Sequence, residues 1–245
     1  MNLNNKVVVI TGASRGIGRT LARAYAKVNA SIVLNYNSSY EEIKEIYEEI
    51  ISYNKNVLVF KADVSVESDV IKMYRATINR FKKVDILVNN AGLCEDNRLN
   101  MMKYEQWSRI MNVNLSGVYL MCKYFTRNMI KNNKGKVFNI ASLKGQQGCV
   151  GQANYSSSKA GVIGLTKTLA LELGEFGILV NAICPGYIVT DLNRKNKDKL
   201  DIAMKKSVLD IRYSLKDLTN FLIFMSSDKI KGVSGQVFNL DSRIS

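Results

Sequence analysis

Residues 6–18 read Lys-Val-Val-Val-Ile-Thr-Gly-Ala-Ser-Arg-Gly-Ile-Gly: an apolar run, a turn with three glycines, and the start of an amphipathic helix that continues to about Val28. The apolar run Lys6–Ile10 is typical of a buried strand. A glycine-rich turn between a strand and a helix lets backbone N–H groups approach a pyrophosphate, and the helix dipole favours negative charge there. The spacing Gly-x-x-x-Gly-x-Gly is wider at first than the usual dinucleotide-binding fingerprint, but its position indicates a phosphate-binding turn.

Strand and helix patterns alternate along the whole chain, without an internal repeat or a change of composition. The predicted strands are Lys6–Ile10, Ser31–Tyr36, Asn56–Ala62, Ile86–Asn89, Lys136–Ala141, Leu179–Cys184 and Gln236–Leu240. The predicted helices after the first are Tyr40–Ser52, Glu67–Phe81, Gln106–Asn132, Tyr155–Glu175 and Leu215–Ser226. This alternation predicts an α/β fold with one Rossmann-type, doubly wound sheet of about seven parallel strands and helices on both faces. Residues 1–245 are expected to form a single dinucleotide-binding and catalytic domain with a substrate lid at about 187–213, where the sequence is Lys-rich and weakly periodic.

Composition narrows the function classes. The chain has 245 residues, of which 47% are hydrophobic, and no apolar run approaches the about 18 residues of a membrane span. Its N-terminal residues lack the basic region and cleavage site of a signal peptide. There is no histidine, and Cys94, Cys122, Cys149 and Cys184 form no Cys-x-x-Cys pair, so we expect reduced thiols, no metal site and a cytoplasmic location. The net charge of +14 arises from scattered basic residues, so neither a nucleic acid nor a membrane is an expected partner.

A second informative stretch is Tyr155-Ser156-Ser157-Ser158-Lys159. A separation of four residues places Tyr155 and Lys159 on one face of the predicted helix. A free phenol has a pKa of about 10, and a nearby cation favours the phenolate and brings this pKa closer to neutral. Tyr and Lys four residues apart are common on surface helices, so the rest of the chain decides whether this pair has a chemical role. Here Ser142 stands one loop earlier, at the carboxyl end of the predicted fifth strand, where ligands of open α/β sheets bind.

The second strand ends in Asn35-Tyr36-Asn37, without the acidic residue that usually binds the ribose hydroxyls of NAD. Arg15 lies in the glycine-rich turn, within reach of a 2′-phosphate on the cofactor ribose, and this favours NADP(H) over NAD(H). The alternative is that Arg15 is only an exposed turn residue. Asp63 follows the third strand and could cap the next helix, contact an adenine edge, or both. Asn114 stands among apolar residues, as a kink or solvent-facing amide or as a buried amide that holds a water.

With these features in place, the chain resembles the short-chain dehydrogenase/reductase family over nearly its entire length. The motifs that carry the resemblance are Thr11-Gly12-Ala13-Ser14-Arg15-Gly16-Ile17-Gly18, Asp63-Val64, Asn89-Asn90-Ala91-Gly92, Asn112-Val113-Asn114, Ser142, Tyr155-Ser156-Ser157-Ser158-Lys159 and Pro185-Gly186. The resemblance implies a nicotinamide cofactor and a catalytic set of Asn114, Ser142, Tyr155 and Lys159. In that set Ser142 would hydrogen-bond the substrate carbonyl and Tyr155 would transfer the proton. Lys159 would lower the phenol pKa and hold the nicotinamide ribose, and Asn114 would position a water.

The resemblance also implies a set of binding residues. The expected cofactor-binding residues are Gly12, Ser14, Arg15, Gly16, Ile17, Gly18, Asn35, Asp63, Val64, Asn90, Ala91, Gly92, Tyr155, Lys159, Pro185, Gly186, Ile188 and Thr190. The expected substrate-binding residues are Ser142, Gln152 and Tyr155.

Within the family the chain is most similar to β-ketoacyl-acyl-carrier-protein reductases. The supporting stretches are Gly151-Gln152-Ala153-Asn154-Tyr155, Ser158-Lys159-Ala160-Gly161, Val180-Asn181-Ala182 and Gly235-Gln236-Val237. This similarity implies NADPH-dependent reduction of a ketone to a secondary alcohol, with a β-ketoacyl thioester of fatty acid biosynthesis, presented on acyl carrier protein, as the best candidate substrate. It also implies a homotetramer or homodimer formed through the helices around 106–132 and 152–175.

Several positions depart from that narrower pattern. Asn133 and Phe176 stand where such reductases often carry basic residues that dock the carrier protein, although Lys131 and Lys134 are close by. The chain has Asp241-Ser242-Arg243 where Asp-Gly-Gly is usual. The alternatives are therefore a reductase or dehydrogenase of a sugar, polyol or secondary-metabolite ketone and, more remotely, a catalytically silent nucleotide sensor.

Overall fold

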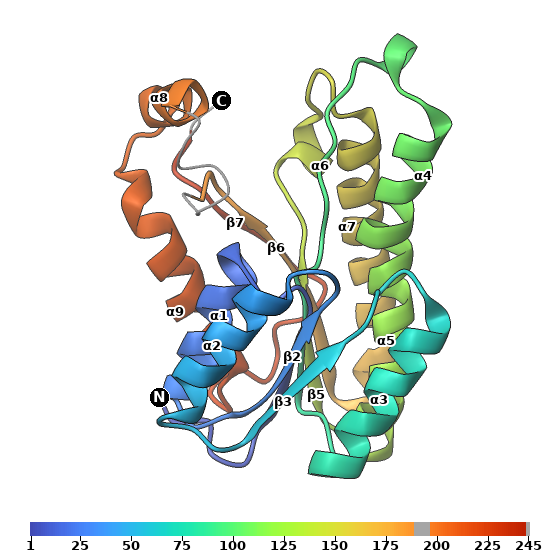
Figure 1. Ribbon diagram of the computed structural model, residues 1–245, viewed down its shortest axis with the longest axis vertical. Helices are drawn as coiled ribbons and strands as arrows, with labels where there is room; N and C mark the ends of the chain where they lie inside the picture. Colours follow the sequence, from blue (N-terminus) through green and yellow to red (C-terminus); the bar gives the residue numbers. More distant parts are fainter. Residues whose placement is uncertain (189–196, 244–245) are drawn as a thin grey trace.

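A seven-stranded parallel sheet forms the centre of the structure, a computed structural model in which residues 1–188 and 197–243 are described, with backbone alone for 197–199 (Figure 1). The strand order is β3-β2-β1-β4-β5-β6-β7, and each pair of neighbours is parallel. The strands are β1 (Val7–Ile10), β2 (Ser31–Tyr36), β3 (Val57–Lys61), β4 (Ile86–Asn89), β5 (Gly135–Ile140), β6 (Ile178–Pro185) and β7 (Val237–Leu240). The predicted Rossmann-type α/β fold is confirmed.

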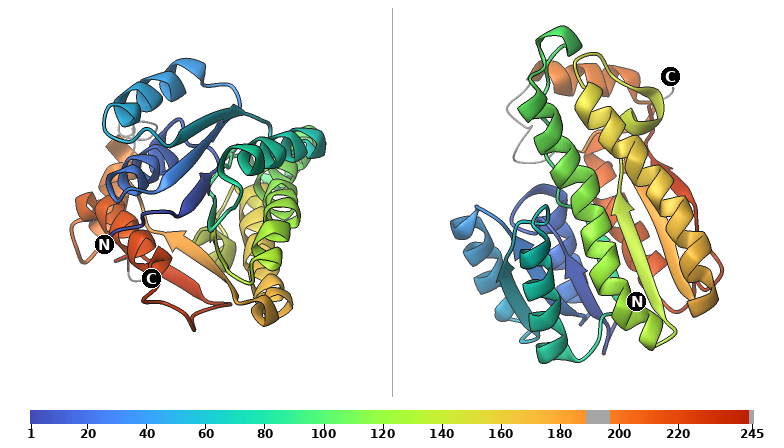
Figure 2. Two further views of the ribbon diagram at one scale, coloured as in Figure 1. Left: turned by 90° about the horizontal axis from the view of Figure 1, so that it is seen from below. Right: turned by 90° about the vertical axis from the view of Figure 1, so that its right-hand side faces the viewer.

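Helices cover both faces of this sheet (Figures 1 and 2). They are α1 (Gly16–Lys27), α2 (Tyr40–Ile51) and α9 (Ser214–Ser226) on one face, and α3 (Glu67–Phe81), α4 (Tyr104–Met111), α5 (Gly117–Lys131) and α7 (Ala153–Leu173) on the other. Successive strand residues point to opposite faces, so Val8 and Ile10 join the first core while Val9 joins the second. A strand buried on both sides must be apolar throughout, which explains the unbroken apolar run of β1.

Short elements complete the chain. They are the 3₁₀ turns η1 (Leu99–Met101), η3 (Gly174–Phe176) and η4 (Ile211–Tyr213), the π-helical turn η2 (Asn112–Ser116), and the helices α6 (Lys144–Gln147) and α8 (Lys197–Lys206). The predicted helix Gln106–Asn132 is therefore three pieces, α4, η2 and α5. Part of the predicted lid, residues 189–196, lies outside the described residues. None of the described helices has both the length and the apolar character needed to cross a membrane.

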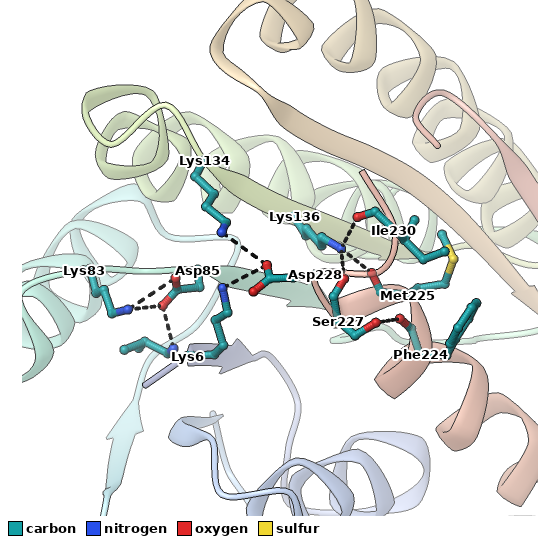
Figure 3. A network of polar contacts seen from close by, with 11 residues as sticks. Lys6, Lys83, Asp85, Lys134, Lys136, Phe224, Met225, Ser227, Asp228 and Ile230 are labelled. Carbon is teal, nitrogen blue, oxygen red and sulfur yellow. Dashed lines mark hydrogen bonds and ion pairs between the residues drawn. The ribbon is translucent and has the colours of Figure 1, made fainter. Parts of the chain in front are cut away.

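The buried side chain of Lys136, near the start of β5, contacts the end of α9 (Figure 3). The Nζ of Lys136 donates to the carbonyl oxygens of Met225, Ser227 and Ile230, each at 2.7 Å. The last carbonyls of a helix lack helical partners and carry partial negative charge, so an ammonium group stabilises them. Burial lowers the pKa of Lys136 to about 8, whereas the three carbonyl contacts favour its charged form.

Replacing Lys136 with methionine is expected to lower the free energy of unfolding by about 3 kcal/mol, because two buried carbonyls and one partly buried carbonyl lose their donor at once. Lys134 is the matched control, since it is 59% exposed and pairs with Asp228 at 3.2 Å on the same edge. Lys134→Met should cost less than about 1 kcal/mol. Urea denaturation of both variants measures the difference, and equal losses would contradict a special role for the carbonyl contacts.

Candidate active site

A cleft of about 1090 Å³ opens where the strands end, and it includes the point where the strand order reverses between β1 and β4. The predicted site residues that line it are Gly12, Ser14, Arg15, Gly16, Ile17, Asn35, Asp63, Val64, Asn90, Ala91, Gly92, Ser142, Tyr155, Lys159, Pro185, Gly186 and Ile188. Gly18, Asn114 and Gln152 lie outside this lining, and Thr190 lies outside the described residues. The fold thus gathers most of the predicted residues in one cleft, and their contacts with a cofactor stay predictions.

The glycine-rich turn needs glycine for two different reasons. Gly12 and Gly16 have φ values of +63° and +56°, in the left-handed region that side chains disfavour. Gly18 has no such constraint, but a Cβ there would lie 2.2 Å from the carbonyl oxygen of Gly12 and 2.6 Å from Nδ2 of Asn90. The turn therefore packs tightly against the start of α1, whose first turn carries no acidic side chain. This open, positively polarised helix end fits a pyrophosphate.

Polar side chains from neighbouring strands hold that turn in place. Asn90 donates through Nδ2 to the carbonyl oxygens of Thr11 and Gly12 at 2.9 and 3.1 Å. Thr11 Oγ1 accepts the backbone N–H groups of Asn90 and Ala91 at 2.9 and 3.0 Å. These contacts join the loop after β4 to the loop after β1. Thr11 was not among the predicted site residues, because its role depends on a partner 79 residues away.

Asn35 is buried and bonded within the protein. Its Oδ1 accepts the N–H of Gly12 at 3.2 Å, and its Nδ2 donates to the carbonyl oxygen of Ala62 at 2.9 Å. The side chain thus links the first glycine to the end of β3. The hydrogen bonds of Asn35 with Gly12 and Ala62 hold the backbone of the glycine-rich turn. A direct contact between Asn35 and a cofactor stays a prediction.

The prediction that Asp63 caps the following helix is wrong. The N-cap of α3 is Val66, without a side-chain hydrogen bond. Asp63 Oδ1 instead accepts the N–H and the hydroxyl of Ser65 at 2.9 and 2.6 Å, and its Oδ2 accepts from Asn37 at 3.0 Å. An Asp side chain readily bonds the backbone two residues on, and here that local turn satisfies the carboxylate before the helix begins. A contact with an adenine edge stays a prediction.

Tyr155 and Lys159 lie together on α7 and face the cleft, as their spacing predicted. The Nζ of Lys159 lies 5.8 Å from the centroid of the Tyr155 ring. The same ammonium is buried and donates to the carbonyl oxygen of Ile140 at 2.7 Å, at the end of β5. The last residue of β5 therefore fixes the position of the ammonium group near the Tyr155 ring.

Burial sets the protonation of this pair. It raises the pKa of Tyr155 to about 12, while a hydrogen bond with Ser142 lowers that pKa in part. It also lowers the pKa of Lys159 to about 8. Tyr155 consequently holds its proton at neutral pH and can donate it. The lowering of the phenol pKa by Lys159 stays a prediction, which requires the cation to act on the phenol oxygen.

Asn114 is fully buried in η2, which excludes the solvent-facing alternative. Its Oδ1 accepts the N–H of Leu93 at 2.7 Å, and its Nδ2 donates to the carbonyl oxygen of Leu93 at 2.9 Å and to Ser158 Oγ at 3.2 Å. A Cβ at Gly92 would lie 3.4 Å from Asn114 Oδ1 and 3.5 Å from Lys159 Nζ, so these two groups flank the same glycine. The π turn, a frequent feature of functional sites, brings this amide beside the lysine. The water that Asn114 was expected to position stays a prediction.

Gln152 is outside the cleft lining but contacts one of its residues, Cys94. Its Nε2 donates to Asp96 Oδ1 at 2.8 Å and lies 3.3 Å from Cys94 Sγ, and Cys94 itself lines the cleft. Neither Cys94 nor Asp96 was singled out as a site residue, because nothing in their local sequence separates them from loop residues. Among the residues that the structure describes, no three His, Cys, Asp or Glu side chains come together as a metal site requires.

Comparison with known proteins gives a consistent result. The short chain dehydrogenase family model matches residues 6–201. A 3-oxoacyl-[acyl-carrier-protein] reductase FabG of Staphylococcus epidermidis is 38% identical over 238 residues, which cover 97% of this chain and 98% of that protein. The FabG protein of Staphylococcus aureus is 37% identical over 96% of both chains. A 3-oxoacyl-[acyl-carrier-protein] reductase of Synechocystis is 36% identical, covering 98% of this chain and 96% of its own.

Proposed function

The chain belongs to the short-chain dehydrogenase/reductase family, and from this premise we propose that it is an NADPH-dependent reductase of β-ketoacyl thioesters. The observation that supports this most directly is the cleft in which Ser142, Tyr155 and Lys159 meet at the carboxyl ends of the strands. The names of the similar proteins support the substrate class and its presentation on acyl carrier protein. We further propose that the protein acts in fatty acid biosynthesis in the cytoplasm.

The residues of the cleft suit the reduction of a ketone. A bound nicotinamide supplies the hydride to the carbonyl carbon. Ser142 donates a hydrogen bond to the carbonyl oxygen and fixes its position, and Tyr155 donates the proton to that oxygen. The ketone gains one hydride and one proton and becomes a secondary alcohol. Lys159 stabilises the negative charge that then develops on the phenol oxygen.

Arg15 supports a preference for NADP(H). It is exposed and lines the cleft with Asn37, Ser38 and Ser39. The carboxylate of Asp63 also lines the cleft, but it is bonded to Asn37 and Ser65. Arg15→Gln is expected to raise KM for NADPH about tenfold and to leave KM for NADH nearly unchanged, because the guanidinium would contact only the 2′-phosphate.

Arg19→Gln is the matched control for the cofactor preference. Arg19 lies one helical turn further on and pairs with Glu45 at 2.7 Å. Steady-state kinetics with both cofactors should show a lower NADPH-to-NADH preference in the Arg15 variant alone. A wild-type protein that uses NADH more efficiently would overturn the assignment.

The substrate class is tested with a panel in the presence of NADPH. It contains acetoacetyl thioesters of acyl carrier protein and of a small thiol, together with sugars, polyol-derived ketones and simple ketones. We expect the thioesters to give the highest kcat/KM. Turnover of a sugar with failure on every thioester would replace the proposal by the sugar and polyol alternative, and no turnover of any ketone would favour the nucleotide sensor.

The partners are also proposals. A homotetramer or homodimer is supported by apolar residues left exposed on the long helices, with Leu171 of α7 85% exposed and Tyr119 of α5 48% exposed. Asn133 and Phe176 do not supply the charges expected at a carrier-protein site. Lys134 is close by, but it pairs with Asp228. A thioester on a small thiol that reacts as well as the carrier-bound one would argue against specific carrier docking.

A further inference from the structure

The end of β7 holds the loop that follows Ser142. Gln146 of α6 and Asn239 of β7 pair their side-chain amides, with Gln146 Nε2 donating to Asn239 Oδ1 at 2.7 Å and Asn239 Nδ2 donating to Gln146 Oε1 at 3.2 Å. Gln146 Nε2 also lies 3.3 Å from Cys184 Sγ near the end of β6. The amide pair therefore fixes the loop after Ser142 against the last two strands.

Leu240 and Asp241, which come directly after Asn239, lie beside the turn Pro185-Gly186, and this turn lines the cleft. The N–H of Gly186 donates to the carbonyl oxygen of Leu240 at 2.8 Å. A Cβ at Gly186 would lie 2.6 Å from Asp241 Oδ1 and 3.0 Å from the Leu240 carbonyl oxygen. Position 186 is thus glycine because the C-terminal segment occupies the space beside it.

The same segment then pairs with the chain that leaves α8. Ser207 and Arg243 form an antiparallel bridge, and the N–H of Val208 donates to the carbonyl oxygen of Ser242 at 3.0 Å. α8 ends at Lys206, so the bridge begins at the first residue after this helix. The C-terminal segment therefore fixes the point at which the chain leaves α8.

An ion pair inside the segment restricts its shape. Arg243 Nε and Nη2 lie 2.7 and 2.6 Å from Asp241 Oδ2, and Asp241 Oδ1 accepts the N–H of Arg243 at 3.1 Å. The side chain of Asp241 is 5% exposed and that of Arg243 is 22% exposed. Charge-assisted contacts of this kind are stronger when water is largely excluded.

We propose that the segment Asn239–Arg243 is a positioning element of the active site. It holds three segments at fixed places relative to one another: the loop after Ser142, the turn Pro185-Gly186 and the start of the chain after α8. Of these, Ser142 and the turn Pro185-Gly186 line the cleft. Arg243 acts through Asp241 and does not touch the substrate. This inference rests on the proposed reductase function for its kinetic readout alone, because its structural readout needs no substrate.

The test compares Arg243→Gln with Arg212→Gln in the full-length protein. Arg212 is the matched control because it forms the same i,i+2 pair with Asp210 on the surface, where its side chain is 80% exposed. Amide hydrogen exchange at Val208 and Gly186 should become about tenfold faster in the Arg243 variant and stay unchanged in the Arg212 variant. KM for the ketone should rise about tenfold with kcat changed less than about threefold, since the reacting groups themselves are intact.

Arg243→Lys keeps the charge and is expected to restore most of the amide protection. Far-UV circular dichroism shows whether each variant is folded. If Arg243→Gln is poorly folded, the exchange data of Arg243→Lys keep the test decisive. Unchanged exchange at both amides in a folded Arg243→Gln protein would overturn the proposal, as would equal effects of the two arginine substitutions. If no ketone is turned over, the exchange data still decide the positioning role, and the failure then belongs to the proposed function.

Discussion

Tyr155→Phe is expected to lower kcat by about three orders of magnitude while the dissociation constant for NADPH changes less than about threefold. Burial raises the pKa of Tyr155 to about 12, so the phenol keeps its proton at neutral pH and can give it to a carbonyl oxygen beside Ser142. Phenylalanine preserves the ring that packs 5.8 Å from the Lys159 ammonium and removes the hydroxyl alone. The loss should therefore appear in the chemical step and not in binding.

Single-turnover reduction and NADPH fluorescence titration separate these two quantities. Tyr104→Phe is a suitable control, since Tyr104 is exposed on α4 and should tolerate loss of its hydroxyl. Near-wild-type turnover by the Tyr155 variant would reject the mechanism. A large loss of cofactor affinity would instead show that the hydroxyl contributes mainly to binding.

Features with a local cause could be predicted from the sequence. The boundaries of β2, α3 and β4 agree with the predicted ranges because apolar patterns and flanking polar residues fix them locally. The pairing of Tyr155 with Lys159 follows from helical geometry, since four residues make about one turn. The glycine turn was recognisable from its place between a strand and a helix.

Features that depend on distant partners could not be predicted. Asn35 bonds Gly12 and Ala62, which follow two other strands, so its structural role cannot be predicted from the sequence of its own strand. The π turn at Asn114 interrupts an apolar pattern that otherwise predicts one continuous helix, because the buried amide binds the backbone of Leu93. In the sequence, Asp241-Ser242-Arg243 is visible only as a departure from the usual Asp-Gly-Gly, because the contacts of Asp241 with position 186 and of Ser242 with Val208 arise from the fold.

Lys159→Met is expected to lower kcat/KM about a thousandfold, because methionine fills a similar volume without the cation that stabilises the developing phenolate. The pH dependence gives the sharper test. Burial places the pKa of Lys159 at about 8 and that of Tyr155 at about 12. As pH rises through about 8, Lys159 loses its charge while Tyr155 still holds its proton.

The reductive kcat/KM of the wild-type protein should therefore fall as pH rises through about 8. The residual activity of Lys159→Met should be flat between about pH 7 and about pH 9, that is, within about one unit of the Lys159 pKa. Pre-steady-state hydride transfer, followed as loss of NADPH absorbance, measures both profiles without interference from product release. A descending limb that persists in the methionine variant would belong to another group. A wild-type rate that rises through pH 8 would show that neutral Lys159 is the active form, and the proposed charge stabilisation by its ammonium group would then be wrong.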